Sequence, residues 1–278
     1  MSETIYSLEV IMKIAVLSDI HEDFNRSRTG ENILAIVEKW IKSNSPEVFI
    51  LSGDMTTRPK TALVLLNQLQ KNCSGTKLLY VHGNHDVYHD DSKEAYNILL
   101  EFPGNLGNGS VQLTNDWVII GDGGWYDYSL GLKTYTEEEY VKGSFGGFTW
   151  PDKIHANWPR SDKDETERYA RNLEIQLQEN QAKNIIMVTH FMPFAHFLQH
   201  KNKPSWDFFH SMMGSEKFGE LAVKYGVKKY IFGHIHTRYQ ENYQGIEVIC
   251  NPLGYYPYEW IHDSAEEEIL STIKTIEI

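Results

Sequence analysis

The sequence has few cysteines, no long hydrophobic run and no excess of positive charge. Its two cysteines, Cys73 and Cys250, are far apart and lie outside any CxxC motif. This usage fits reduced thiols better than a disulfide framework, so we expect a cytoplasmic protein. No apolar run approaches the roughly 20 residues that a membrane-spanning helix needs. The opening MSETIYSLEV also has neither the basic nor the apolar region of a secretory signal, so we expect none.

The charge balance is acidic, with 26 Lys and Arg against 38 Asp and Glu and a net charge of −12. A broad nucleic-acid surface needs clustered basic residues, and the sequence offers no such cluster. Bound metal ions would add positive charge to a cleft that this count omits. We therefore expect a small-molecule partner rather than nucleic acid or a membrane, and the oligomeric state stays open.

Apolar runs and helical spacing alternate along the chain, which predicts an α/β protein. The first half has strand-like runs at 13–19, 48–51 and 78–81 with amphipathic segments between them, the βαβαβ pattern of a mainly parallel sheet. Further strands are predicted at 118–120, 185–188, 230–232, 246–249 and, as a closing strand, 269–278. Without repeats or linkers, residues 13–278 are expected to form a single domain after an N-terminal extension, residues 1–12.

Five short polar signatures stand at the ends of apolar runs. They are Asp19-Ile20-His21, Gly53-Asp54, Gly83-Asn84-His85-Asp86, Thr189-His190 and Gly233-His234-Ile235-His236. In open α/β sheets, ligands collect at the carboxyl ends of strands. Asp19 and His21, two apart in an extended segment, would project to the same side.

Carboxylate, amide and imidazole groups of this kind hold pairs of divalent first-row metal ions. The signatures supply seven candidate metal ligands: Asp19, His21, Asp54, Asn84, His190, His234 and His236. Seven ligands are too many for one ion, so we predict two ions bridged by Asp54. Mixed nitrogen and oxygen ligation without cysteine favours Mn²⁺ or Fe, with Zn²⁺, Co²⁺ and Ni²⁺ as alternatives. Spacing alone does not divide the ligands between the ions.

The ordered set D-x-H, G-D, G-N-H-D, H and G-H-x-H resembles the calcineurin-like metallophosphoesterase superfamily over residues 13–252. The resemblance implies a four-layer α/β/β/α sandwich of two mixed β-sheets flanked by helices. It also implies a division of the ligands, with Asp19, His21, Asp54 and His236 on one metal and Asp54, Asn84, His190 and His234 on the other.

The function that the resemblance implies is that of a metal-dependent phosphoric ester hydrolase. A hydroxide bridging the metals would attack the phosphorus of a small organic phosphodiester or phosphomonoester. His85 would stabilise the transition state or protonate the leaving oxygen, and Asp86 would orient neighbouring groups or cap a loop. The alternatives are an exonuclease-type phosphodiesterase and a non-catalytic binding or scaffold protein on the same fold. The complete ligand set and the presence of His85 favour catalysis.

Several positions depart from the superfamily's motifs, and these departures reduce the number of its branches that the chain resembles. Thr57 stands where purple acid phosphatases carry Tyr and where Ser/Thr protein phosphatases carry the Asp that orients the catalytic His. Pro59 replaces the last Gly of the protein-phosphatase motif, and His85 stands where lipid A pathway pyrophosphatases carry Arg. The resemblance that remains is to bacterial phosphodiesterases and phosphatases and to the exonuclease branch.

Three segments between the expected strands, 122–160, 191–213 and 253–263, are polar and yet rich in aromatic residues. Such residues either wall a substrate cleft or pack the loops against the domain. For the set as a whole we favour cleft walls, and we expect Trp125, Trp150 and Tyr255 to contact substrate.

Overall fold

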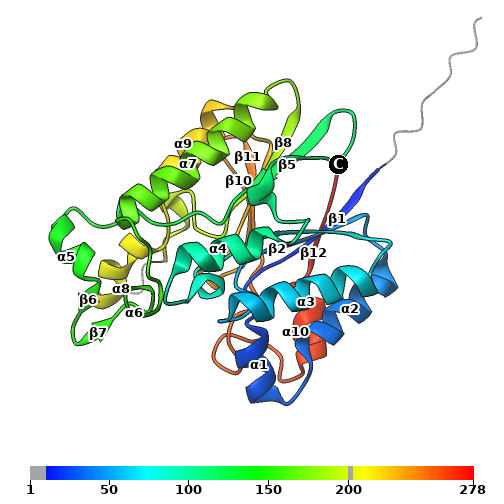
Figure 1. Ribbon diagram of the computed structural model, residues 1–278, viewed down its shortest axis with the longest axis horizontal. Coiled ribbons are helices and arrows are strands. Elements are labelled where there is room, and N and C mark those ends of the chain that lie inside the picture. Colours follow the sequence, from blue (N-terminus) through cyan, green and yellow to red (C-terminus); the bar gives the residue numbers. More distant parts are fainter. Residues whose placement is uncertain (1–10, 200–202) are drawn as a thin grey trace, which may run out of the picture.

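The first half of the chain alternates strands and helices as predicted. The computed structural model describes residues 11–199 and 203–278, so the expected extension at residues 1–12 lies almost wholly outside it (Figure 1). The first elements are β1 (Lys13–Leu17), α1 (Glu22–Thr29), α2 (Ile33–Asn44), β2 (Val48–Ser52), α3 (Pro59–Asn72), β3 (Lys77–Val81) and α4 (Ser92–Leu100). The runs are apolar at successive positions because the strands are covered on both faces: every residue of β2 is buried.

The middle of the chain continues with short elements and one long helix. They are β4 (Val111–Gln112), β5 (Trp117–Gly121), α5 (Glu137–Lys142), β6 (Ser144–Phe145), β7 (Phe148–Thr149), α6 (Asp152–His155), α7 (Asp162–Glu179) and β8 (Asn184–Val188). The segment 122–160 therefore contains two short helices and a small hairpin rather than loop alone.

The last part of the chain completes both sheets. Its elements are α8 (Pro204–Phe209), α9 (Glu216–Lys224), β9 (Lys229–Phe232), β10 (Tyr239–Tyr243), β11 (Ile246–Cys250), α10 (Ala265–Thr272) and β12 (Lys274–Glu277). The closing strand predicted over 269–278 is wrong in its first half, because Ile269 lies in α10. The side chain of Ser264 accepts from the backbone N–H of Glu267 and so caps this helix. Three acidic residues in its first turn suit the helix dipole.

Two mixed sheets form the centre of the fold. The first has the order β12-β1-β2-β3, with β12 antiparallel to β1 and the other pairs parallel. The second has the order β10-β11-β9-β8-β5-β4, parallel in the middle and antiparallel at both edges. A bridge between Ser18 and Pro252 joins the ends of β1 and β11, so the two sheets meet at this point.

Alternate residues of both sheets pack against each other and form one apolar layer. The fully buried members of this layer include Val16, Ile50, Val81, Ile186 and Ile231. Helices α2, α3 and α10 cover the outer face of the first sheet, and α7 and α9 cover that of the second (Figure 1). The result is the predicted four-layer α/β/β/α sandwich. Within the described residues, none of the helices combines the length and apolar character needed to cross a membrane.

Candidate metal centre

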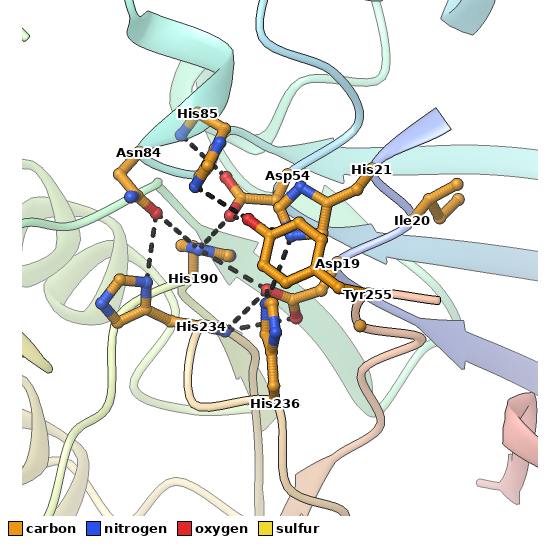
Figure 2. Close-up of polar contacts among 12 residues, drawn as sticks. Asp19, Ile20, His21, Asp54, Asn84, His85, His190, His234, His236 and Tyr255 are labelled. Carbon is orange, nitrogen blue, oxygen red and sulfur yellow. Dashed lines mark hydrogen bonds and ion pairs between the residues drawn. The ribbon is translucent and has the colours of Figure 1, made fainter. Parts of the chain in front are cut away.

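The seven predicted metal ligands come together where the carboxyl ends of strands from both sheets meet (Figure 2). They follow the strands β1 (Asp19 and His21), β2 (Asp54), β3 (Asn84), β8 (His190) and β9 (His234 and His236). Backbone hydrogen bonds tie these ends together. The N–H of Asp19 donates to the carbonyl of Gly53 at 3.0 Å, and the N–H of His234 donates to the Asp19 carboxylate at 3.1 Å.

The backbone of the ligand segments is turned rather than extended. Five of the eight non-glycine residues with positive φ in the described chain are metal-ligand candidates: Asp19, His21, Asp54, His234 and His236. Such conformations are uncommon outside glycine and cluster at functional sites. The expectation that Asp19 and His21 share one side of an extended segment is therefore wrong. Their side chains converge because both residues adopt the left-handed conformation.

The first ligand group consists of Asp19, His21, Asp54 and His236, whose ligand atoms lie within 4.8 Å of one another. His236 Nε2 lies 3.1 Å from Asp19 Oδ1 and 3.2 Å from His21 Nε2. His21 Nε2 lies 3.7 Å from Asp54 Oδ2. Ligands held about 2.1 Å from one ion lie roughly 3–4 Å apart, so these separations suit a shared metal.

The second ligand group contains Asp54, His190 and His234, again within 4.8 Å, and Asn84 lies among them. His190 Nε2 lies 3.4 Å from Asp54 Oδ2 and 3.2 Å from Asn84 Oδ1. His234 Nδ1 lies 3.1 Å from the same amide oxygen. Since Asp54 belongs to both groups, its carboxylate is placed to bridge two ions.

Hydrogen bonds on the far side of two imidazoles fix which nitrogen faces the site. His190 Nδ1 lies 2.8 Å from the carbonyl of Ser52, and His234 Nε2 lies 3.2 Å from the carbonyl of Met212. A carbonyl can only accept, so these nitrogens carry the protons. The lone pairs of His190 Nε2 and His234 Nδ1 are thereby turned toward the ligand group, as in many metal sites.

The cluster concentrates buried negative charge. Burial would raise the pKa of Asp19, yet His236 and His190 lower it to about 2. Burial would lower the pKa of His236, but Asp19 and Glu259 raise it to about 10. The Glu259 carboxylate lies 2.7 Å from His236 Nδ1. Two buried carboxylates that draw positive charge, with amide and imidazole donors around them, fit a pair of divalent metal ions.

His85 lies beside the ligand groups and not within them. Its backbone N–H donates to Asp54 Oδ1 at 2.9 Å, and its Nε2 lies 3.2 Å from the hydroxyl of Tyr255 (Figure 2). The Tyr255 ring stacks on His21 at 4.3 Å. The other ring nitrogen of His85, Nδ1, is buried without a hydrogen-bond partner among the described residues. The missing partner agrees with the sequence, in which Thr57 stands where Ser/Thr protein phosphatases carry the Asp that orients this ring.

Asp86 orders the loops that carry two ligands. Its fully buried carboxylate accepts the backbone N–H groups of Asp54, Met55, Thr56 and Gly83 at 2.8–3.1 Å. Of the two roles that the sequence left open, this geometry supports the orienting one. Burial and the nearby Asp54 raise the pKa of Asp86 to about 7. We therefore treat Asp86 as a positioning residue and not as a catalytic one.

Asp152 of α6 is a site residue that the sequence did not identify. Its buried carboxylate accepts from the amide of Asn84 and the hydroxyl of Tyr88, both at 2.7 Å, and from Trp150 Nε1 at 2.9 Å. The first bond holds the amide so that the Asn84 carbonyl oxygen faces His190 and His234. No motif marks Asp152, because its partner Asn84 is 68 residues away in sequence.

The aromatic segments divide between the two roles considered above. Phe148, Trp150, Trp206 and Tyr255 line a hollow over the ligand groups, so residues from all three segments reach the cleft. Trp125 does not, which corrects our expectation for it. Its side chain is buried, stacks on Tyr126 at 5.0 Å and donates from Nε1 to Asp162 at 2.8 Å. The Trp125 ring fills space in the interior, so its position follows from packing and not from contact with substrate.

Comparisons with known proteins agree with this architecture. A family model described as calcineurin-like phosphoesterase matches residues 12–238. The phosphopantetheinyl hydrolase of Mycobacterium tuberculosis is 17% identical in sequence, with a TM-score of 0.74 over 95% of each chain. A dimetal phosphatase from Danio rerio is 14% identical, with a TM-score of 0.53 over 86% of each chain. At these identities the likeness concerns the fold. No curated protein sequence matches the chain significantly.

Proposed function

The chain belongs to the calcineurin-like phosphoesterase family, and from this membership we propose that it hydrolyses a small organic phosphoester with the help of two metal ions. The observation that carries the proposal is the convergence of seven ligand side chains into two groups that share Asp54. Mixed nitrogen and oxygen ligation favours Mn²⁺ or Fe at both positions. Bound metal ions would supply a nucleophile at neutral pH and neutralise the charge of the attacked phosphate.

The side chains around the ligand groups supply the rest of the chemistry. His85 Nε2 lies 3.2 Å from the Tyr255 hydroxyl, and both side chains line the hollow over the ligand groups. General acid–base help of this kind is worth about 10²–10⁴ in rate. Asp86 accepts from the backbone of the Asp54 loop, and aromatic side chains wall the hollow above the ligand groups. His85 is therefore the residue that we assign to protonation of the leaving oxygen.

Hydrolysis of a substrate panel by Mn²⁺-loaded protein tests the proposal. The panel consists of bis-p-nitrophenyl phosphate, p-nitrophenyl phosphate, cyclic AMP and single-stranded DNA. We expect turnover of at least one nitrophenyl ester, with loss of that turnover in the chelated protein. Cleavage of DNA alone would favour the exonuclease alternative. Metal binding without turnover of any ester would favour the non-catalytic scaffold.

The comparison with the Mycobacterium enzyme adds one substrate to the panel. That protein is named a phosphopantetheinyl hydrolase, and the two chains match over nearly their whole lengths. A phosphopantetheinyl ester is therefore a reasonable further substrate for this chain. Turnover well above that of bis-p-nitrophenyl phosphate would support the assignment, and equal or lower turnover would argue against it.

A further inference from the structure

Neither ring nitrogen of His85 is open to a substrate. Its Nδ1 is buried and makes no hydrogen bond within the part of the chain that the structure describes. Its Nε2 lies 3.2 Å from the hydroxyl of Tyr255. An imidazole nitrogen makes one hydrogen bond in the plane of its ring, and the Tyr255 hydroxyl occupies that direction. The group that a leaving oxygen meets on this side of the site is therefore the hydroxyl and not the imidazole.

Tyr255 reaches the site from the loop that follows β11. Its ring stacks on His21 at a centroid distance of 4.3 Å and packs edge-on against His236 at 4.9 Å. Its side chain lines the hollow over the ligand groups, together with Asp54. Figure 2 shows the ring beside the metal-ligand candidates, with its hydroxyl turned toward His85. A phosphoester bound over the ligand groups would lie next to this hydroxyl.

The Tyr255 side chain is held in this position by its own loop and by α1. Its backbone N–H donates to Glu259 Oε2 at 2.7 Å, and the same oxygen lies 2.7 Å from His236 Nδ1. The ring of Phe24 packs against the Tyr255 ring at 4.8 Å. Because the loop is tied to a metal-ligand candidate, the hydroxyl keeps its place relative to the ligand groups. A proton donor needs such a fixed place within hydrogen-bond reach of the atom that it serves.

The second tyrosine beside His85 has a hydroxyl that is already engaged as donor and as acceptor. The ring of Tyr88 contacts that of His85 at a centroid distance of 4.6 Å. Its hydroxyl donates to Asp152 at 2.7 Å and accepts from the amide of Asn84 at 3.1 Å. The hydroxyl of Tyr255 differs, because among the described residues its hydrogen-bond partner is His85. When Nε2 carries a proton, the Tyr255 oxygen accepts that N–H, and the hydroxyl hydrogen is left to point into the hollow.

We propose that Tyr255 is a catalytic residue, whose hydroxyl protonates the leaving oxygen and is itself reprotonated by His85. This inference rests on the proposed function and adds one step to it: the proton comes from His85 but reaches the substrate through Tyr255. As the P–O bond to the leaving group breaks, its electron pair stays on the leaving oxygen, which takes the hydroxyl proton. The phenol oxygen takes the Nε2 proton in the same step. The attacking water, whose oxygen forms the new P–O bond, releases one proton and so balances the one that His85 gives.

Tyr255→Phe is the direct test, because it removes the hydroxyl and keeps the ring that stacks on His21. The substrates are diphenyl phosphate and bis-p-nitrophenyl phosphate, since phenoxide depends on protonation to leave far more than nitrophenoxide does. In metal-loaded Tyr255→Phe, kcat for diphenyl phosphate should fall about 10²-fold or more, and kcat for the nitrophenyl ester should change much less. The affinity for Mn²⁺ should stay the same. Near-normal kcat for diphenyl phosphate would overturn the inference.

Two further variants separate a relay from a structural role. His85→Ala should lose the same activity as Tyr255→Phe, and the double variant should be no slower than the slower single variant, because both changes break one relay. Tyr258→Phe makes the same chemical change in the same loop on a side chain that is 77% exposed, so it should alter nothing. Losses that multiply in the double variant would show that Tyr255 acts independently of His85 and would overturn the inference.

The number of protons in transfer gives a second readout. With diphenyl phosphate, kcat in mixtures of H₂O and D₂O should depend on the deuterium fraction along a curve, since two protons move together. This curvature should weaken in Tyr255→Phe. A straight line for the unaltered protein would contradict the relay.

The hydrogen bond between His85 and Tyr255 is measurable without metal or substrate. In metal-free protein labelled with ¹⁵N-histidine, the ring resonances of His85 are those that are missing from His85→Ala. Tyr255→Phe should shift the Nε2 resonance, and Tyr258→Phe should not. An unshifted resonance in Tyr255→Phe would remove the contact on which the relay depends.

Bis-p-nitrophenyl phosphate separates failure of the relay from failure of the proposed function. If the unaltered protein cleaves this ester, and Tyr255→Phe cleaves diphenyl phosphate as fast as the unaltered protein does, this inference fails and the phosphoesterase function stands. If the metal-loaded protein cleaves no phosphoester at all, the proposed function fails and this inference fails with it.

Discussion

The contacts of Asp54 at this site could not be inferred from its neighbours in sequence. Asp54 belongs to both ligand groups, adopts a φ of 56° and accepts the backbone N–H of His85. One carboxylate thus joins the two metal positions and the nearest candidate acid. His85 makes no contact that would place it among the ligands. Substitution of Asp54 and substitution of His85 should therefore affect different properties, metal binding and turnover.

We predict that Asp54→Asn loses metal, whereas His85→Ala keeps it and loses turnover. A neutral amide in place of the shared carboxylate removes negative charge from both positions. Loss of His85 removes only acid–base help, so kcat should fall by about 10²–10⁴. Elemental analysis and steady-state kinetics on the same preparations measure both effects. Near-normal kcat in metal-loaded His85→Ala protein would refute the role of this residue.

A second residue-scale prediction concerns Asp152. Asp152→Ala removes the acceptor for the Asn84 amide, so the carbonyl oxygen of Asn84 is no longer held toward the metals. Loss of such an outer partner typically weakens metal affinity by about 10–100-fold. Titration of apo protein with Mn²⁺, read out by calorimetry, measures the change.

Asp152→Asn is the matched control for this prediction. It keeps one carbonyl oxygen that can accept from Asn84 and Tyr88, so its metal affinity should fall less than that of Asp152→Ala. Circular dichroism checks that both variants are folded. Equal affinities in Asp152→Ala and the unaltered protein would show that Asn84 needs no support.

At the scale of elements, the segment between β5 and α7 builds one side of the cleft. Helix α6 of this segment supplies Asp152. Strand β7 supplies Phe148, and Trp150 follows this strand directly. The Trp150 ring stacks on Phe209 of α8 at 5.3 Å, so the wall joins two segments that are distant in sequence. Trp125 of the same segment is buried in the interior, where its ring contacts Tyr126 and Phe191.

We predict opposite consequences for two tryptophan substitutions in this segment. Trp125→Ala should cost about 3–5 kcal/mol of folding free energy, because it empties a buried site, with little change in KM for the protein that remains folded. Trp150→Ala should change KM while the unfolding free energy changes less. Urea denaturation and kinetics with two substrates separate these effects. A KM change in Trp125→Ala as large as that in Trp150→Ala would contradict the assignment.

At the scale of the whole molecule, the candidate metal centre joins the two sheets. Asp19 and Asp54 follow strands of the first sheet, and His190 and His236 follow strands of the second. Without metal, like charges lie close together at the end of the first sheet: the charge of Asp54 acts to raise the pKa of the Asp19 carboxyl. Bound metal ions would remove this repulsion and, because their candidate ligands come from both sheets, would fasten one sheet to the other.

We therefore predict that metal removal lowers the melting temperature. A ligand at 100 times its Kd stabilises the folded state by about 2.7 kcal/mol, which corresponds to roughly 5 °C or more for a chain of this size. Calorimetric scans with Mn²⁺ and with a chelator measure the shift. Asp54→Asn provides the comparison, since its melting temperature should not respond to the chelator. A chelator-independent melting temperature in the unaltered protein would rule out strong metal binding.

The sequence alone determined the alternation of strands and helices and the identity of the metal-ligand candidates. Both depend on local information. A run such as Val48–Leu51 is apolar because it is buried on both faces, and short polar motifs mark where such runs end. The sequence also predicted that His85 has no carboxylate partner, because Thr57 stands at the position where related protein phosphatases carry that Asp.

Tertiary structure decided everything that depends on residues far apart in the chain. The partner of Asn84 is Asp152, and the partner of His85 is Tyr255, which is 170 residues away. Whether an aromatic residue lines the cleft or fills the core, as Trp150 and Trp125 do, depends on which space the packed sheets and helices leave open. Composition cannot reveal that space, because the packing of side chains depends on how all the helices and strands are arranged in the folded protein.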